Sequence, residues 1–118
     1  MNKWNKLQCE RVESPVASAV IFRLRGALTD TTEAFAFLDE VRAEVRDARR
    51  LIVINLAQVD HLTSAGVGVL AAAFTSTWQK SSKLCLVGAS ARAQQVLTVV
   101  GLWAQVPHAE SEDAALAG

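Results

Sequence analysis

Apolar and polar residues alternate near the start of the chain, which is the pattern of half-buried β-strands. The alternation is clear over residues 19–25 and weaker over residues 7–13. A turn near Ser14 and Pro15 would join the two strands into an antiparallel hairpin at a sheet edge. Gly26 is expected to end the second strand.

A helical spacing of apolar residues follows Gly26, and Asp30 or Thr31 can cap this first helix. Its inward face is expected to consist of Ala34, Leu38, Val41 and Val45. Residues 51–56 are then an almost uninterrupted apolar run, typical of a strand that is covered on both faces. This strand is expected at the centre of the sheet.

A second helix is predicted to begin at Ser64. Its apolar face is formed by Val67, Leu70, Ala71, Phe74 and Trp78. A short strand at residues 84–87 stops at Gly88, and Ser90 can cap a third helix, which Gly101 ends. The inward residues of the third helix are Ala93, Val96, Leu97 and Val100.

The end of the chain is predicted to hold a last short strand at residues 102–106 and a helical turn from Ser111 to Leu116. The alternation of strands and helices predicts an α/β fold with a mixed sheet of about four to five strands, mostly parallel at its centre. The 118 residues suffice for one domain. We expect its core at about residues 7–107 and a short helical tail at residues 108–118.

The charge balance changes the functional picture. Twelve basic and twelve acidic residues give a formal net charge of zero, so no global field favours direct binding of nucleic acid. Charged residues interrupt the N-terminal segment where a secretion signal needs an apolar run, and no membrane insertion is expected. The protein is therefore predicted to be cytoplasmic.

The residue types suited to metal binding are few and scattered. Cys9 and Cys85 are expected to be buried thiols, and with His61 and His108 they lack the short spacings of zinc sites. We therefore expect neither a metal nor a cofactor.

Hydroxyl groups occur where the central strand leads into the second helix. A hydroxyl on Ser64 can cap the helix, which is worth about 1 kcal/mol, and the residues alone favour this interpretation. The same free amides and the positive end of the helix dipole would also suit a phosphate on Ser64.

Catalytic interpretations of this segment fail. A nucleophile elbow requires glycine two residues before the serine, but Leu62 is there, and a dinucleotide fingerprint begun at Gly66 would require a third glycine. Asp60 and His61 are neighbours on a predicted loop and are expected to be a solvated acid and a surface histidine. The sequence therefore predicts no enzyme.

The segment at residues 53–70 resembles the Asp-Ser-Ser/Thr-Gly-Leu-Gly-Val motif of the STAS domain family, particularly its bacterial anti-sigma factor antagonists. Residues 24–28 (Leu-Arg-Gly-Ala-Leu) are similar to the family's turn before the first helix, and residues 99–103 (Val-Val-Gly-Leu-Trp) to the end of its third helix.

The resemblance implies partner switching, in which the unmodified protein binds an anti-sigma factor and so frees a sigma factor, and phosphorylation of a serine ends that binding. Ser64 falls on the family's phosphorylated serine, with Thr63 as the alternative acceptor. Thr63 stands where many members have Asp, and Ala65 where many have a second hydroxyl. The implied partners are an anti-sigma factor or serine kinase and a PP2C-type phosphatase that resets the protein. The expected contact surface comprises Thr29, Asp30, Asp60, His61, Leu62, Thr63, Ser64, Gly66 and Val67.

Two other classes of protein remain open at this point. The chain could be the STAS subunit of a lipid-transport ABC transporter, or a scaffold that docks a partner ATPase without phosphorylation. It could also be a small enzyme of unrecognised type, although no convergent acid, base and nucleophile are found.

Overall fold

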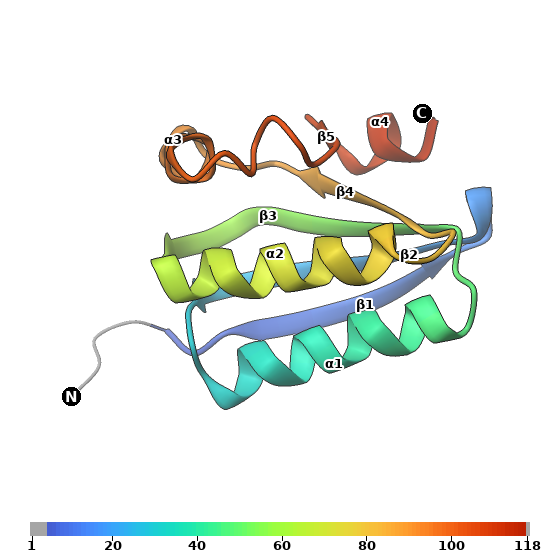
Figure 1. Cartoon of the computed structure of the whole chain (residues 1–118), viewed down its shortest axis with the longest axis horizontal. Coiled ribbons are helices and arrows are strands. Elements are labelled where there is room, and N and C mark those ends of the chain that lie inside the picture. The colour runs from blue at the N-terminus through green and yellow to red at the C-terminus, as the bar shows by residue number, and fades with distance from the viewer. Residues whose placement is uncertain (1–4, 118) are drawn as a thin grey trace.

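The computed structural model describes residues 5–117. Strands and helices alternate along the chain as the sequence predicts, and they form a single α/β domain (Figure 1). In order, the elements are β1 (Gln8–Ser14), the 3-10 helix η1 (Val16–Ser18), β2 (Ala19–Leu28), α1 (Thr32–Arg46), β3 (Leu51–Leu62), α2 (Ser64–Trp78), β4 (Lys83–Val87), α3 (Ala91–Val99), β5 (His108–Ala109) and α4 (Glu112–Ala117).

The sheet is five-stranded with the order β1-β2-β3-β4-β5. β1 pairs with β2 in the antiparallel sense, and the later strands pair in parallel. The predicted edge hairpin and the central position of β3 are confirmed. Because β2, β3 and β4 run parallel, the loops that follow them lie at the same edge of the sheet.

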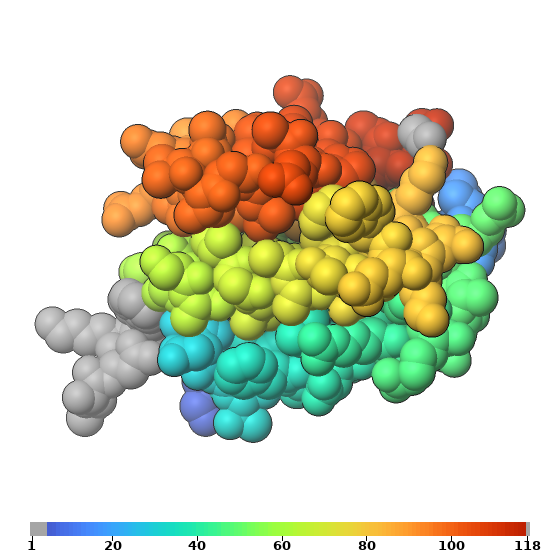
Figure 2. Space-filling view, viewed as in Figure 1, coloured from blue at the N-terminus to red at the C-terminus, as the bar shows by residue number. Residues whose placement is uncertain are grey.

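Helices α1 and α2 lie side by side on one face of the sheet (Figure 1). The main core lies beneath them, and in it the rings of Phe22 and Phe37 meet edge to face with centroids 5.6 Å apart. Leu97 of α3 is buried in the same core. Figure 2 shows this side of the molecule, with the surfaces of α1, of α2 and of the segment from α3 to β5 as three bands.

The short helix α4 covers part of the opposite face, where Ala115 packs with Val53 and Cys85. Ser111 caps it as predicted, its Oγ accepting a bond of 3.1 Å from the amide of Ala114. The Arg23 guanidinium binds both carboxylate oxygens of Glu112 at 2.8 and 2.9 Å, and this donation lowers the pKa of Glu112. The segment after residue 107 therefore contributes β5 to the sheet and α4 to the second layer.

Two strands extend beyond their predicted ends. β2 continues through Gly26 to Leu28, and β3 continues to Leu62. The pairing shifts register between Arg23 and Arg25 and again after Gly26, whose φ is +99°. These bulges let two strands of different local length stay paired, so the glycine continues the strand instead of ending it.

The predicted strand at residues 102–106 is wrong. The amide of Val106 donates to the Leu102 carbonyl at 3.0 Å, which makes a helical turn and directs both side chains inward. The last strand is β5, which pairs with Leu86 and Val87 of β4. Leu102 and Val106 are four positions apart, which fits one turn of helix. In so short a segment, the apolar residues alone did not distinguish this helical turn from a strand.

Three predictions of burial are also wrong. Trp78 is 77% exposed and Val100 is 56% exposed; Trp78 is the last residue of α2, and Val100 directly follows α3. Cys9 is exposed on the edge strand β1, whereas Cys85 is buried as expected, and burial raises the pKa of its thiol. Among residues 5–117, no helix has both the length and the hydropathy needed to cross a membrane.

Candidate functional site

Thr63 joins the start of α2 to the end of β2. Its extended backbone places it at the N-cap, and its Oγ1 accepts a bond of 3.1 Å from the amide of Gly66. The same hydroxyl donates to Oγ1 of Thr29 at 2.8 Å, and the amide of Thr63 donates to the Leu28 carbonyl at 3.2 Å. The turn at residues 29–30 and the start of α2 therefore lie together, as the parallel strands predict.

Ser64 is the first residue of α2 and is exposed. The interpretation of Ser64 as the helix cap is wrong, because Thr63 occupies that position. Helix geometry leaves the amides of Ser64 and Ala65 without an intrahelical acceptor, and the helix dipole is positive at this end. An anion attached to Ser64 would be stabilised there.

Gly66 lies where α2 approaches β2 most closely. A Cβ at this position would overlap the Leu28 carbonyl oxygen and lie 3.1 Å from Cδ1 of Leu62. Gly66 is buried, so it does not belong to the contact surface where it was expected. Its lack of a side chain instead allows the start of α2 to lie against β2. Gly68, two residues further along α2 and exposed, would meet nothing within 4 Å with an added Cβ.

Val67 does not lie on the contact surface either. It is 7% exposed and packs in the main core. The reason is helical geometry: α2 turns its fourth residue toward the sheet, while Ser64, Ala65 and Gly68 face outward. The expectation that Val67 offers an apolar contact to a partner is therefore wrong.

Five other residues of the expected surface lie at this end of the sheet. Asp60, His61 and Asp30 are exposed, and Leu62 and Thr29 are partly buried. Asp60 and His61 belong to β3, not to a loop, and Oδ1 of Asp60 lies 3.0 Å from Nδ1 of His61. Both residues are exposed as expected, and their side chains contact each other.

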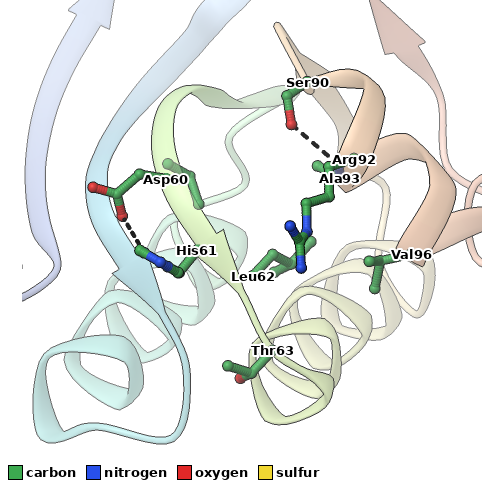
Figure 3. A pocket seen from close by; sticks show the side chains of 9 residues that line it. Asp60, His61, Leu62, Thr63, Ser90, Arg92, Ala93 and Val96 are labelled. Atoms are coloured by element: carbon green, nitrogen blue, oxygen red, sulfur yellow. Dashed lines mark hydrogen bonds and ion pairs between the residues drawn. The ribbon is translucent and has the colours of Figure 1, made fainter. Parts of the chain in front are cut away.

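A cavity of about 370 Å³ opens between the end of β3 and the start of α3 (Figure 3). Its walls mix apolar and polar side chains: Val59, Asp60, His61, Leu62, Thr63, Ser90, Arg92, Ala93 and Val96. The sequence analysis missed the α3 side of this cavity. An arginine in the first turn of a helix, where the dipole disfavours a cation, was the signal available.

The described residues were compared with the arrangements that hold metal ions. Within residues 5–117, no group of three or more His, Cys, Asp or Glu side chains is placed to hold a metal ion. The arrangement near the start of α2 is instead suited to contact with another molecule. It presents the Ser64 hydroxyl, the carboxylates of Asp30 and Asp60, and the apolar side chain of Leu62.

The chain belongs to the STAS domain family, whose model matches residues 9–115. No curated protein sequence matches the chain significantly.

Several solved structures share the fold. An anti-sigma factor antagonist from Mycobacterium paratuberculosis is 21% identical, with a TM-score of 0.80 over 95% of this chain and 92% of that one. SpoIIAA in its phosphorylated form, from Bacillus, is 19% identical, with a TM-score of 0.69 over 92% of this chain and 96% of that one. A sulfate transporter family protein from Wolinella succinogenes is 18% identical, with a TM-score of 0.71 over 90% and 86%.

Proposed function

We propose that this STAS protein is an anti-sigma factor antagonist whose binding is switched off by phosphorylation of Ser64. The observation that carries the proposal is the contrast between two neighbouring hydroxyls. Ser64 is exposed on the first residue of α2, whereas the Thr63 hydroxyl both donates to Thr29 and accepts from Gly66. A kinase reaching Thr63 would have to break the helix cap, so Ser64 is the acceptor.

The unmodified protein binds an anti-sigma factor that is itself a serine kinase, and so releases a sigma factor. The contact surface comprises Thr29, Asp30, the β3 end at residues 60–62 and Ser64. Leu62 supplies the apolar contact, because it is only partly buried at the rim of the cavity. The protein has no catalytic role of its own and acts in the cytoplasm without touching DNA.

Phosphorylation ends the binding by a local electrostatic effect. The kinase transfers the γ-phosphoryl group of ATP to Oγ of Ser64, which loses its proton, and ADP leaves. The phosphate adds a charge of about −1.5 to −2 at the same end of the sheet as the exposed Asp30 and Asp60. A nearly complete switch needs about 5.5 kcal/mol of differential binding, within the range for a charge buried at an interface centre. A PP2C-type phosphatase restores the binding form.

A second candidate function is a docking subunit of a transporter, in which the same surface binds a partner without phosphorylation. The specific observation in its favour is the structural likeness to a sulfate transporter family protein. In that case Ser64 would carry no phosphate in cells, and the partner would be a membrane transport component, such as the ATPase of a lipid transporter.

The test isolates the partner from native lysate with the tagged protein and identifies both the partner and the Ser64 peptide by mass spectrometry. With that partner purified, Ser64→Ala should lose labelling from ATP and keep its affinity. Ser64→Asp should fold normally, because a carboxylate suits a helix N-terminus, and should bind more weakly. Labelling of Ser64→Ala at the wild-type rate would refute the choice of Ser64. A transport component as partner, with unmodified Ser64, would favour the second candidate.

A further inference from the structure

Arg92 is an unexpected residue at its position in α3. It is the second residue of the helix, where the positive end of the dipole disfavours a cation. Ser90 already caps this helix by accepting a bond of 3.1 Å from the amide of Ala93. Local helix chemistry therefore gives no reason for an arginine here, and such departures from local rules are typical of functional positions.

The Arg92 side chain extends into the cavity toward Leu62 (Figure 3). Among residues 5–117 it makes no ion pair, a property that it shares with other exposed arginines such as Arg46. Asp60 also lines the cavity, but its carboxylate is turned to the other side of β3, toward His61. The cavity thus contains a guanidinium without a counter-charge.

The missing counter-charge would be supplied by the modification proposed above. Thr63, the residue directly before Ser64, lines the same cavity as Arg92. A guanidinium binds phosphate through two parallel hydrogen bonds, and the free amides at the start of α2 can hold the remaining oxygens. Arg92 has a long, exposed side chain that can turn from the cavity to its rim.

We propose, on the basis of the proposed phosphorylation of Ser64, that Arg92 is the intramolecular partner of the phosphate. In the phosphorylated protein the pair ties α3 to the start of α2 and closes the cavity. The phosphate is therefore held against the molecule and covers part of the contact surface. Phosphorylation changes the shape of that surface as well as its charge.

The test uses the full chain with phosphoserine installed at position 64 during translation, so that no kinase is needed. Four proteins are compared, with Ser64 or phosphoserine combined with Arg92 or Arg92→Gln. We expect the phosphate to raise the melting temperature by about 2–5 °C more in the protein with Arg92 than in Arg92→Gln. Arg92→Lys should keep part of this difference, because it retains the charge but not the fork.

Arg46→Gln is the matched control, because it removes an exposed arginine in the last turn of α1, at the other end of the helical layer. It should leave the effect of the phosphate unchanged. As a second readout, the side-chain Nε–H resonance of Arg92 should shift on phosphorylation.

Equal effects of the phosphate in the Arg92 and Arg92→Gln proteins, or an unshifted Arg92 resonance, would overturn the pairing. Neither result would contradict the proposed phosphorylation switch, which is tested by kinase labelling of Ser64 and by partner binding. Conversely, a failure of the kinase to label Ser64 would leave this thermodynamic comparison intact.

Discussion

Replacing Gly66 with alanine tests whether the close approach of α2 to β2 forms the site. In an ordinary helix this change is favourable by about 1 kcal/mol, because glycine has the greater backbone freedom to lose. At Gly66 the new Cβ would overlap the carbonyl oxygen of Leu28, which is backbone and cannot rotate away. The helix start or the end of β2 must therefore move.

The magnitude follows from comparing the two effects. Overpacking that forces a backbone shift costs about 1–3 kcal/mol or somewhat more, and here it also strains the bond from the Thr63 amide to the Leu28 carbonyl. Because the overlap is with backbone, the upper part of this range, about 2–3 kcal/mol, applies, and after subtracting the helix gain of about 1 kcal/mol, Gly66→Ala should destabilise the protein by about 1–2 kcal/mol. For a domain of this size, the melting temperature should fall by about 3–10 °C.

Gly68→Ala is the control in the same helix, since a Cβ there meets nothing within 4 Å. It should raise stability by about 0.5–1 kcal/mol. Both variants are compared with the parent by urea unfolding and by thermal melting followed by circular dichroism. The reasoning is refuted if Gly66→Ala is as stable as Gly68→Ala, because the overlap would then carry no cost.

Three further predictions concern the contact surface, the buried core and the pH dependence of folding. Leu62→Glu should remain folded and lose at least about tenfold in affinity for the isolated partner, since it is partly buried at the rim. Val67→Glu should lose about 3 kcal/mol or more of stability, because the charge is buried in the core. A Val67→Glu variant with the same free energy of unfolding in urea as the parent would contradict that placement. The Arg23 guanidinium lowers the pKa of Glu112, so this carboxylate stabilises the fold fully above its unfolded pKa and ceases to do so as the pH falls through the folded value. Glu112→Gln should therefore be less stable than the parent near neutral pH and show a shallower loss in acid; parallel urea-unfolding curves across that range would count against the ion pair.

Features that depend on nearby residues were predictable from the sequence. The apolar run at residues 51–56 marked the central strand, and helical periodicity marked α1 and the start of α2 at Ser64. Ser90 was predicted as a cap and Thr31 was one of two candidates for the cap of α1, because a cap bond spans only three residues. The motif around Ser64 indicated the family, which the match over residues 9–115 confirms.

The boundaries of elements were less predictable, because other strands and helices decide them. β3 continues to Leu62 since β2 remains available for pairing, and bulges keep the two strands in contact. Trp78 fits the apolar face of α2 by its spacing, yet as the last residue of that helix it is 77% exposed.

The sequence by itself therefore determined the order of elements, the family and the candidate serine, all of which are encoded in short-range periodicity and spacing. Only the tertiary structure decided that Thr63 is held by Thr29 and that Gly66 must lack a side chain against Leu28. It also placed Arg92 in a cavity with the residue before Ser64. These contacts join residues about thirty positions apart, and a linear pattern does not specify which side chains meet when separate strands and helices pack together.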